Sequence, residues 1–163
     1  MLHAFANWVG TTSLSWFVMH YAWVWPTAET LHFVGLSLVV GVSGLFDLRL
    51  MGFFRDVPVA ALQRMVPWAI AGFAINLSTG VLFFFGTPFQ YVDNLAFRLK
   101  MAFVVLDGVN ALLFELLVSE RTLAVGAGGE TPITARIIGA ASLVCWLSVL
   151  CWGRLLPYIG EAF

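Results

Sequence analysis

Long apolar stretches, separated by charges, glycines and prolines, dominate the pattern of hydrophobic and polar positions along the chain. Four of them are long enough to cross a bilayer, which takes about 20 mostly apolar residues in a helix. They cover residues 27–51, 60–85, 96–124 and 132–158. The connections are short, and short connections make consecutive helices antiparallel neighbours. The sequence therefore predicts an all-α, integral membrane, up-down four-helix bundle that forms a single domain over residues 1–163.

The N-terminal stretch, residues 2–19, has a different pattern. It places Trp8, Trp16 and Phe17 among small polar residues, without the positive start and continuous apolar core of a secretory signal. Tryptophan is favoured where a membrane meets water. We expect this stretch to be an interfacial helix that breaks between Gly10 and Ser13.

Composition supports a membrane protein. Hydrophobic residues make up 61% of the chain and charged residues only 10%, against about 25% in a soluble domain. The lipid bilayer is therefore the expected partner. The net charge of −1 and the absence of a basic run argue against nucleic acid.

The distribution of positive charge predicts an orientation. Five arginines fall on one side of the predicted bundle: residues 49, 55, 64, 121 and 136. Only Arg98, Lys100 and Arg154 fall on the other. Because cytoplasmic segments carry the excess of Lys and Arg, the first side is expected to be cytoplasmic. Both termini would then be periplasmic, in a bacterial inner membrane.

His32 is the main candidate for chemistry, because an ionisable residue inside a membrane helix is costly to bury. Antiparallel packing predicts that Arg98, Lys100 and Arg154 lie at the same end of the bundle as Glu29 and His32. A histidine can ligate haem iron, and the cations can pair with propionates. The same residues also fit a structural ion-pair cluster, such as Glu29 with Arg98 or Arg154. His20 is a weaker second ligand.

The third stretch is the most polar. Lys100, Asp107, Ala111 and Glu115 recur on one helical face, with Asn110 beside them. One interpretation is a buried hydrogen bond from Asn76 or Asn110 to Asp107 that fixes helix packing. The other is a proton or redox relay. At the far end of the first stretch, Asp47 and Arg49 are expected to form an interfacial ion pair.

Three segments also carry a resemblance: WPTAETLHFVGLSLVVGVSGLFDLRLMG from Trp25, Val66-Pro67-Trp68, and NLAFRLKMAFVVLDGVNALLF from Asn94. They resemble an uncharacterised family of bacterial four-helix membrane proteins. They are more distantly similar to CopD-type copper-resistance domains and HemJ-type protoporphyrinogen oxidase, through Leu31-His32 and Leu99-Lys100. The resemblance implies a bundle that binds haem b or a porphyrin, with His32 and Lys100 as the key pair. Relatives often carry a histidine where this chain has Glu115, which argues against a second cofactor.

Three hypotheses for function follow. The first is a haem b- or porphyrin-binding membrane protein with a redox or electron-transfer role; as an enzyme, it would be an oxidoreductase acting on a porphyrin. The second is a non-catalytic accessory subunit of a larger membrane complex or homo-oligomer. The third is CopD-like copper handling.

Overall fold

The computed structural model describes residues 2–159, whose regular structure is entirely helical. Four long helices form the body: α3 (Val24–Met51), α5 (Val66–Gly86), α7 (Leu95–Leu117) and α9 (Ile133–Leu155). Six shorter helices lie at their ends: α1 (Leu2–Gly10), α2 (Ser13–His20), α4 (Val59–Gln63), α6 (Pro88–Val92), α8 (Ser119–Leu123) and the 3₁₀ helix η1 (Leu156–Tyr158).

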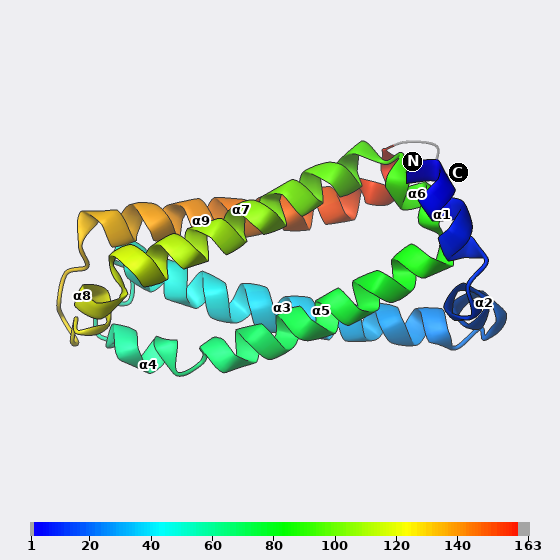
Figure 1. Ribbon diagram of the computed structural model, residues 1–163. Helices are drawn as coiled ribbons and strands as arrows, with labels where there is room; N and C mark the ends of the chain where they lie inside the picture. The colour runs from blue at the N-terminus through cyan, green and yellow to red at the C-terminus, as the bar shows by residue number, and fades with distance from the viewer. Residues whose placement is uncertain (1, 160–163) are drawn as a thin grey trace.

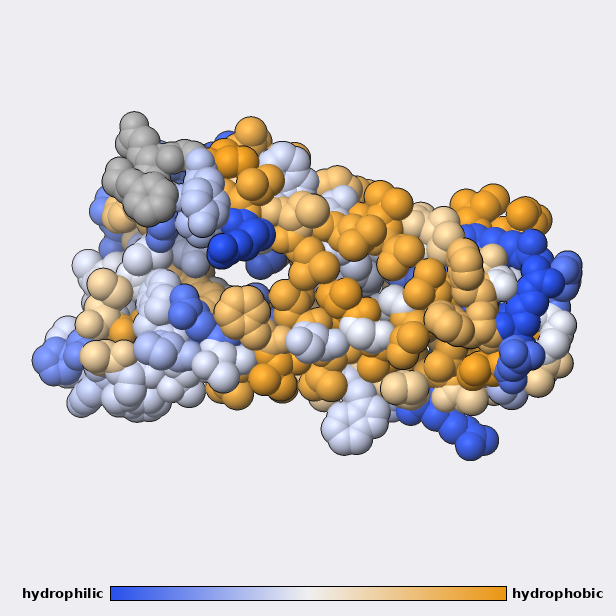
Figure 2. All heavy atoms as spheres, turned by 180° about the vertical axis from the view of Figure 1, so that it is seen from behind, coloured by the Kyte–Doolittle hydropathy of each residue, from blue (hydrophilic) through white to orange (hydrophobic). Residues whose placement is uncertain are grey.

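Three helical segments of the described chain are long and apolar enough to cross a membrane: Val24–Met51, Val59–Gly86 and Ile133–Tyr158. Figure 2 shows an apolar central surface with hydrophilic residues gathered toward the two ends, as a membrane protein requires. The long helix α7 is not among the three, and it carries Arg98, Lys100, Asp107 and Glu115. Three of the four predicted segments are therefore long and apolar enough to span a membrane.

The long helices form two antiparallel pairs, α3 with α5 and α7 with α9, which meet through contacts between α3 and α9 (Figure 1). The helices α5 and α7 follow one another in sequence but are not among the closely packed pairs. The short helix α6 occupies the connection between them and packs against α1. The prediction that consecutive long helices are packed neighbours is therefore wrong for α5 and α7.

Glycines allow the closest approaches between helices. A Cβ on Gly72 would lie 2.6 Å from the carbonyl oxygen of Gly35, and a Cβ on Gly139 would lie 2.9 Å from the carbonyl oxygen of Asp47. Small residues at such crossings let membrane helices pack through their backbones. They set the spacing of α3 against α5 and of α3 against α9.

Two predicted helices are interrupted. The stretch predicted over residues 60–85 breaks after Gln63, and α5 begins at Val66 with Pro67 in its first turn. A proline ring clashes with the carbonyl four residues earlier, which here belongs to Gln63, so one continuous helix is disfavoured. The stretch predicted over residues 96–124 is broken at Val118, whose φ of −139° is not helical. No proline or glycine marks this second break in the sequence.

The N-terminal segment packs across one end of the molecule, where α1 contacts α6 and α2 contacts α5 (Figure 1). The predicted break is confirmed, since Thr11 and Thr12 separate α1 from α2. The Thr12 hydroxyl accepts a hydrogen bond from the Ser15 amide at 3.3 Å and so caps α2.

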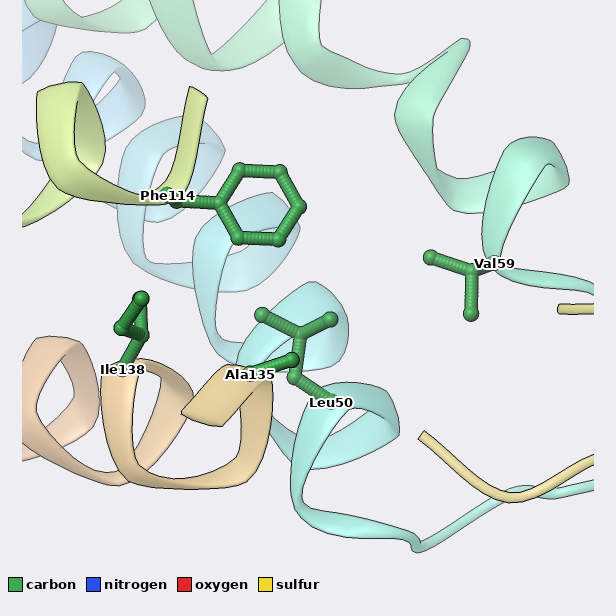
Figure 3. Close-up of a cluster of buried hydrophobic side chains, with 5 residues drawn as sticks. All are labelled: Leu50, Val59, Phe114, Ala135 and Ile138. Carbon is green, nitrogen blue, oxygen red and sulfur yellow. The ribbon is translucent and has the colours of Figure 1, made fainter. Parts of the chain in front are cut away.

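The opposite end holds a hydrophobic cluster of five buried residues, which Figure 3 shows converging from four helices: Leu50, Val59, Phe114, Ala135 and Ile138. Gly52 ends α3 in a left-handed conformation with φ of 101°, and the amide of Phe53 donates to the carbonyl of Leu48. This end therefore ties the loop after α3 to α4, α7 and α9.

Candidate functional site

His32 points from α3 toward α5. Its Nδ1 lies 2.7 Å from the hydroxyl oxygen of Thr79, which is buried. That hydroxyl lies 2.8 Å from the carbonyl oxygen of Ile75, to which it donates its single proton. When the neutral ring carries its proton on Nδ1, this hydroxyl accepts from His32. In that tautomer Nε2 keeps a lone pair, the form in which imidazole binds a metal.

Asn76, one turn before Thr79, holds the backbone of the same helix turn. With its amide nitrogen turned toward α3, Asn76 donates to the carbonyl of His32 at 2.7 Å and accepts from the amide of Leu36 at 2.9 Å. The same nitrogen lies 3.2 Å from Nδ1 of His32 and donates to it when Nδ1 is unprotonated. These bonds satisfy both ends of a half-buried amide. Asn76 therefore positions His32, and the expectation that it would pair with Asp107 is wrong.

Lys100 is the cation that the structure brings to His32. Its positive charge acts on the imidazole ring. The Lys100 side chain also runs along Gly153 of α9, where an added Cβ would lie 3.6 Å from Nζ. No hydrogen bond joins His32 to Lys100 in the described structure, and their role as a pair stays a prediction. The immediate partners of His32 come from α5, however, and not from α7 and α9 alone.

Aromatic side chains form one wall of this site. Phe83 lies 5.5 Å from His32 and 5.2 Å from Trp25, measured between ring centroids. Figure 2 shows an opening between the two helix pairs at the end that carries the N-terminal helices, with both apolar and hydrophilic residues around it. The helix pairs are thus splayed at the end where His32 and Lys100 lie.

The other predicted members of the site are held locally. Trp25 donates to the Glu29 carboxylate at 3.2 Å, while both Nε and Nη2 of Arg98 donate to the carbonyl of Val92 at 3.3 and 2.9 Å. The Arg154 guanidinium lies over the ring of Tyr158 at 5.8 Å. In the described part of the chain, Glu29 forms no ion pair with either arginine. The predicted structural ion-pair cluster is therefore not formed.

Glu29 instead has Tyr91 nearby. Burial, together with the negative charge of Glu29, raises the pKa of Tyr91 to about 12. The phenol is consequently neutral at physiological pH and able to donate a hydrogen bond.

His20 and His3 lie in the N-terminal helices. His20 stacks on Trp16 at a centroid distance of 4.3 Å, and His3 lies 3.4 Å from the carboxylate of Asp93. Neither histidine has a contact with His32 among residues 2–159. His20 is thus an exposed residue that packs against an aromatic side chain.

A second polar site lies between the long helices. A cavity of about 280 Å³ is lined by α3, α5, α7 and α9 and by the end of α4, and it includes both Asp47 and Asp107, which are 4% and 8% exposed. We call it the acidic cavity. Its other polar lining residues are Ser43, Gln63, Asn110, Glu115, Ser142 and Trp146. Asp107, Ala111 and Glu115, which share a face of α7, all line this cavity.

The two carboxyl groups of the acidic cavity share Ser142 of α9 as a neighbour. Asp47 Oδ2 and Asp107 Oδ1 are buried without a hydrogen-bond partner in the described structure. Asn110 does not bond to Asp107, because its amide donates to the carbonyl of Ile138 at 3.0 Å. The predicted Asn–Asp107 packing bond is therefore absent from the described part of the chain.

The predicted ion pair of Asp47 with Arg49 is also wrong. Arg49 is 0% exposed, and its Nε donates to the carbonyl of Val57 at 2.6 Å. Its Nη2 faces the carbonyls of Arg55, Gly126 and Gly129 at 3.3–3.5 Å. Residues two apart on a helix point in different directions, so Arg49 faces the loops while Asp47 faces the acidic cavity.

Comparisons with other proteins identify a family. Residues 5–159 match the family model described as a family of unknown function, DUF6644. The chain belongs to DUF6644. No curated protein and no solved structure matches it, so the more distant resemblance to CopD-type and HemJ-type proteins finds no support there.

Two side chains of this DUF6644 protein were not expected from its sequence. Thr79 anchors His32, and Ser142 lies between the two aspartates. A serine or threonine in an apolar helix commonly bonds to its own backbone, so residue type alone does not single it out. Asn76 and Thr79 do share a helix face, and that spacing was an available signal.

Three features of the His32 site are compatible with a porphyrin: an imidazole that offers Nε2 in one tautomer, a hydroxyl that orients the ring through Nδ1, and an aromatic wall. A hydrogen bond to the distal nitrogen of a metal-binding histidine fixes its tautomer and orientation. In the described residues, no group of three or more His, Cys, Asp and Glu side chains is placed to hold a metal ion. A haem iron, held mainly by its macrocycle, needs only one or two protein ligands.

Proposed function

We propose that this protein binds haem b, or a related porphyrin, and takes part in a redox or electron-transfer reaction in the bacterial inner membrane. His32 is the axial ligand in this proposal. The observation that carries it is the 2.7 Å contact of Nδ1 with the Thr79 hydroxyl, which orients the ring and, in the tautomer protonated on Nδ1, keeps the Nε2 lone pair available.

The surroundings of His32 suit an amphiphilic macrocycle. Phe83 and Trp25 offer apolar contact, while Lys100 offers an ammonium to an acidic group on the ring. Arg98 and Arg154 bond only to a backbone carbonyl and a phenol ring in the described structure, so their charges remain available for propionates. Bound haem would supply one-electron chemistry, and the protein supplies the ligand, its orientation and the charges that hold the ring.

The proposal includes a four-helix membrane bundle in which α7 spans with the others, its polar face turned inward toward α9. Both termini would lie on the periplasmic side. The charge distribution supports this orientation, because three arginines lie at the α4–α8 end. Arg49 donates to loop carbonyls there, and Arg55 and Arg136 both pair with Glu130. That end would be cytoplasmic by the excess of positive charge.

The test is an absorbance spectrum of the full chain, purified in detergent from cells supplied with a haem precursor. We expect a Soret band that disappears in His32→Ala. Thr79→Val removes the hydroxyl while keeping the side-chain shape, and should weaken haem binding by about 10- to 100-fold, as loss of such an orienting group does.

The matched control is Ser78→Ala. Ser78 neighbours Thr79 on α5, but its exposed hydroxyl donates only to the carbonyl of Ala74. This variant should bind haem as the unaltered protein does. A colourless protein after haem has been supplied, or a Soret band unchanged in His32→Ala, would overturn the proposal.

A further inference from the structure

The acidic cavity contains two carboxyl groups that lack a counter-ion. Asp47 and Asp107 are both more than nine-tenths buried, and each has an oxygen that faces no hydrogen-bond partner in the described structure. Among residues 2–159, no lysine, arginine or histidine lines the cavity. The nearest fixed positive charge on α3, Arg49, is committed to backbone carbonyls of the loops.

We propose that Asp47 and Asp107 form a proton-binding site in the interior of the bundle, with at least one of the two held as a protonated acid at neutral pH. The step is a simple proton transfer. An O–H bond forms at a carboxyl oxygen, and an O–H bond breaks in a hydronium ion that reaches the cavity from bulk water. This site is separate from His32 and does not depend on a bound porphyrin.

Two physical effects favour the protonated form of this pair of carboxyl groups. A carboxylate moved out of water into an apolar interior loses its hydration and neutralises when no partner compensates it. Two carboxylates in one site also repel each other, so that the pair holds a proton in common. Ser142 lies beside both groups and can bond to either, but a hydroxyl carries no charge to balance them.

The other titratable groups near the pair do not supply a positive charge. Glu115 of α7 lines the same cavity, and Cys145 of α9 lies within electrostatic range of both aspartates. The parts of α4 and α5 that line the cavity contribute only Gln63, Val66 and Ala69. Each of these groups is neutral or acidic, so none of them stabilises a doubly charged pair.

The cavity also gives the proton a route. Its volume of about 280 Å³ leaves room for several water molecules, and Asp47, Asp107, Asn110 and Ser142 offer them polar partners. Glu115 lies two turns beyond Asp107, about 12 Å along α7, and is exposed. We therefore infer that the pair exchanges protons through the α4–α8 end of the molecule, past Glu115 and the break between α4 and α5.

Dicyclohexylcarbodiimide tests the site, because this lipid-soluble reagent adds to protonated carboxyl groups and spares charged ones. The full chain in detergent would be treated at neutral pH and mapped by mass spectrometry. We expect the label on Asp107 or Asp47 and none on the exposed Glu29 or Glu120. Asp107→Asn, which keeps the shape of the protonated acid, should lose the label at that position.

The coupling of the two groups gives a second measurement. In Asp47→Asn one negative charge is gone, so the pH at which Asp107 labelling is half-maximal should fall. Glu120→Gln, outside the cavity, should leave that pH unchanged. An infrared carboxylic-acid band that shifts in D₂O and is lost in Asp107→Asn gives an independent readout if the reagent does not reach the cavity.

Three results would overturn the proposal. The first is the absence of both the label and the infrared band at neutral pH. The second is a labelling pH for Asp107 that does not change in Asp47→Asn. The third is labelling that is blocked by sodium or magnesium ions at constant pH, which would make the cavity a cation site instead.

Discussion

The crossing of α3 and α5 can be tested by adding one methyl group. In Gly72→Ala the new Cβ would lie 2.6 Å from the carbonyl oxygen of Gly35, 2.8 Å from Cβ of Leu38 and 3.1 Å from Cγ2 of Val39. The first two of these atoms are fixed to the α3 backbone and cannot rotate away. The two helices must therefore separate, and the His32–Thr79 contact lies on the same interface.

The expected magnitude is a balance of two terms. Overpacking a close contact costs about 1–3 kcal/mol. Replacing glycine by alanine inside a helix contributes about 0.8–1 kcal/mol in the opposite direction. Because a backbone carbonyl blocks the methyl, we expect the upper part of the first range and a net destabilisation of about 1–2 kcal/mol.

Gly80→Ala, on the same helix, is the matched control. Nothing lies within 4 Å of a Cβ built on Gly80, so this variant gains helix propensity without a clash. Both variants make the same chemical change in α5. The difference between their free energies of unfolding therefore isolates the crossing, and should be about 2–3 kcal/mol in favour of Gly80→Ala.

The assay is equilibrium unfolding in mixed detergent micelles, followed by the fluorescence of the seven tryptophans. In a chain of this size each kcal/mol corresponds to roughly 2–4 °C in a melting temperature, so thermal melts give a second reading. If Gly72→Ala and Gly80→Ala are equally stable, the close crossing of α3 and α5 is not present in the protein.

Two further predictions concern buried polar side chains and use the same unfolding measurement. Arg49→Met leaves several loop carbonyls without their donor and should cost more than about 3 kcal/mol, since each unsatisfied buried group costs about 1–3 kcal/mol; Arg64→Met, at an exposed position, should stay within about 0.5 kcal/mol of the unaltered protein. Equal stabilities for these two variants would refute the loop-anchoring role of Arg49. Asn94 caps α7 through its side-chain oxygen and donates to the carbonyls of Leu156 and Ile159, so Asn94→Ser should lose the donated bonds and Asn94→Ala should lose about 1 kcal/mol more. If Asn94→Ser and Asn94→Ala have equal free energies of unfolding, the side-chain cap of α7 contributes nothing to stability.

The order and approximate extent of the long helices followed from local information. A run of about 20 apolar residues has few ways to satisfy its backbone in lipid other than a helix. The predicted start at residue 27 was three residues late, and Pro67 explains the break before α5. The break at Val118 has no such local cause and was missed.

The candidate sites were likewise predicted only in part. His32 and Lys100 stood out because charge is rare inside an apolar helix, and topology alone placed them at one end. Their partners did not follow from topology, because the rotation of one helix against its neighbour depends on side-chain packing between them. The register of α3 against α5 puts Thr79 beside His32, and that of α3 against α9 puts Ser142 beside Asp47.

Asp47 and Arg49 show most clearly which features follow from the local pattern and which follow from packing. Composition and hydrophobic pattern were sufficient to predict a helical protein with segments apolar enough to span a membrane, because the cost of exposing apolar groups to water, or polar groups to lipid, depends on the chain alone. Whether two neighbouring charges pair with each other depends on what surrounds each of them. Only the packed structure decided that Arg49 binds the loops while Asp47 faces Asp107 across a cavity, since the carbonyls of residues 126 and 129 and the side chain of Asp107 come from distant parts of the sequence.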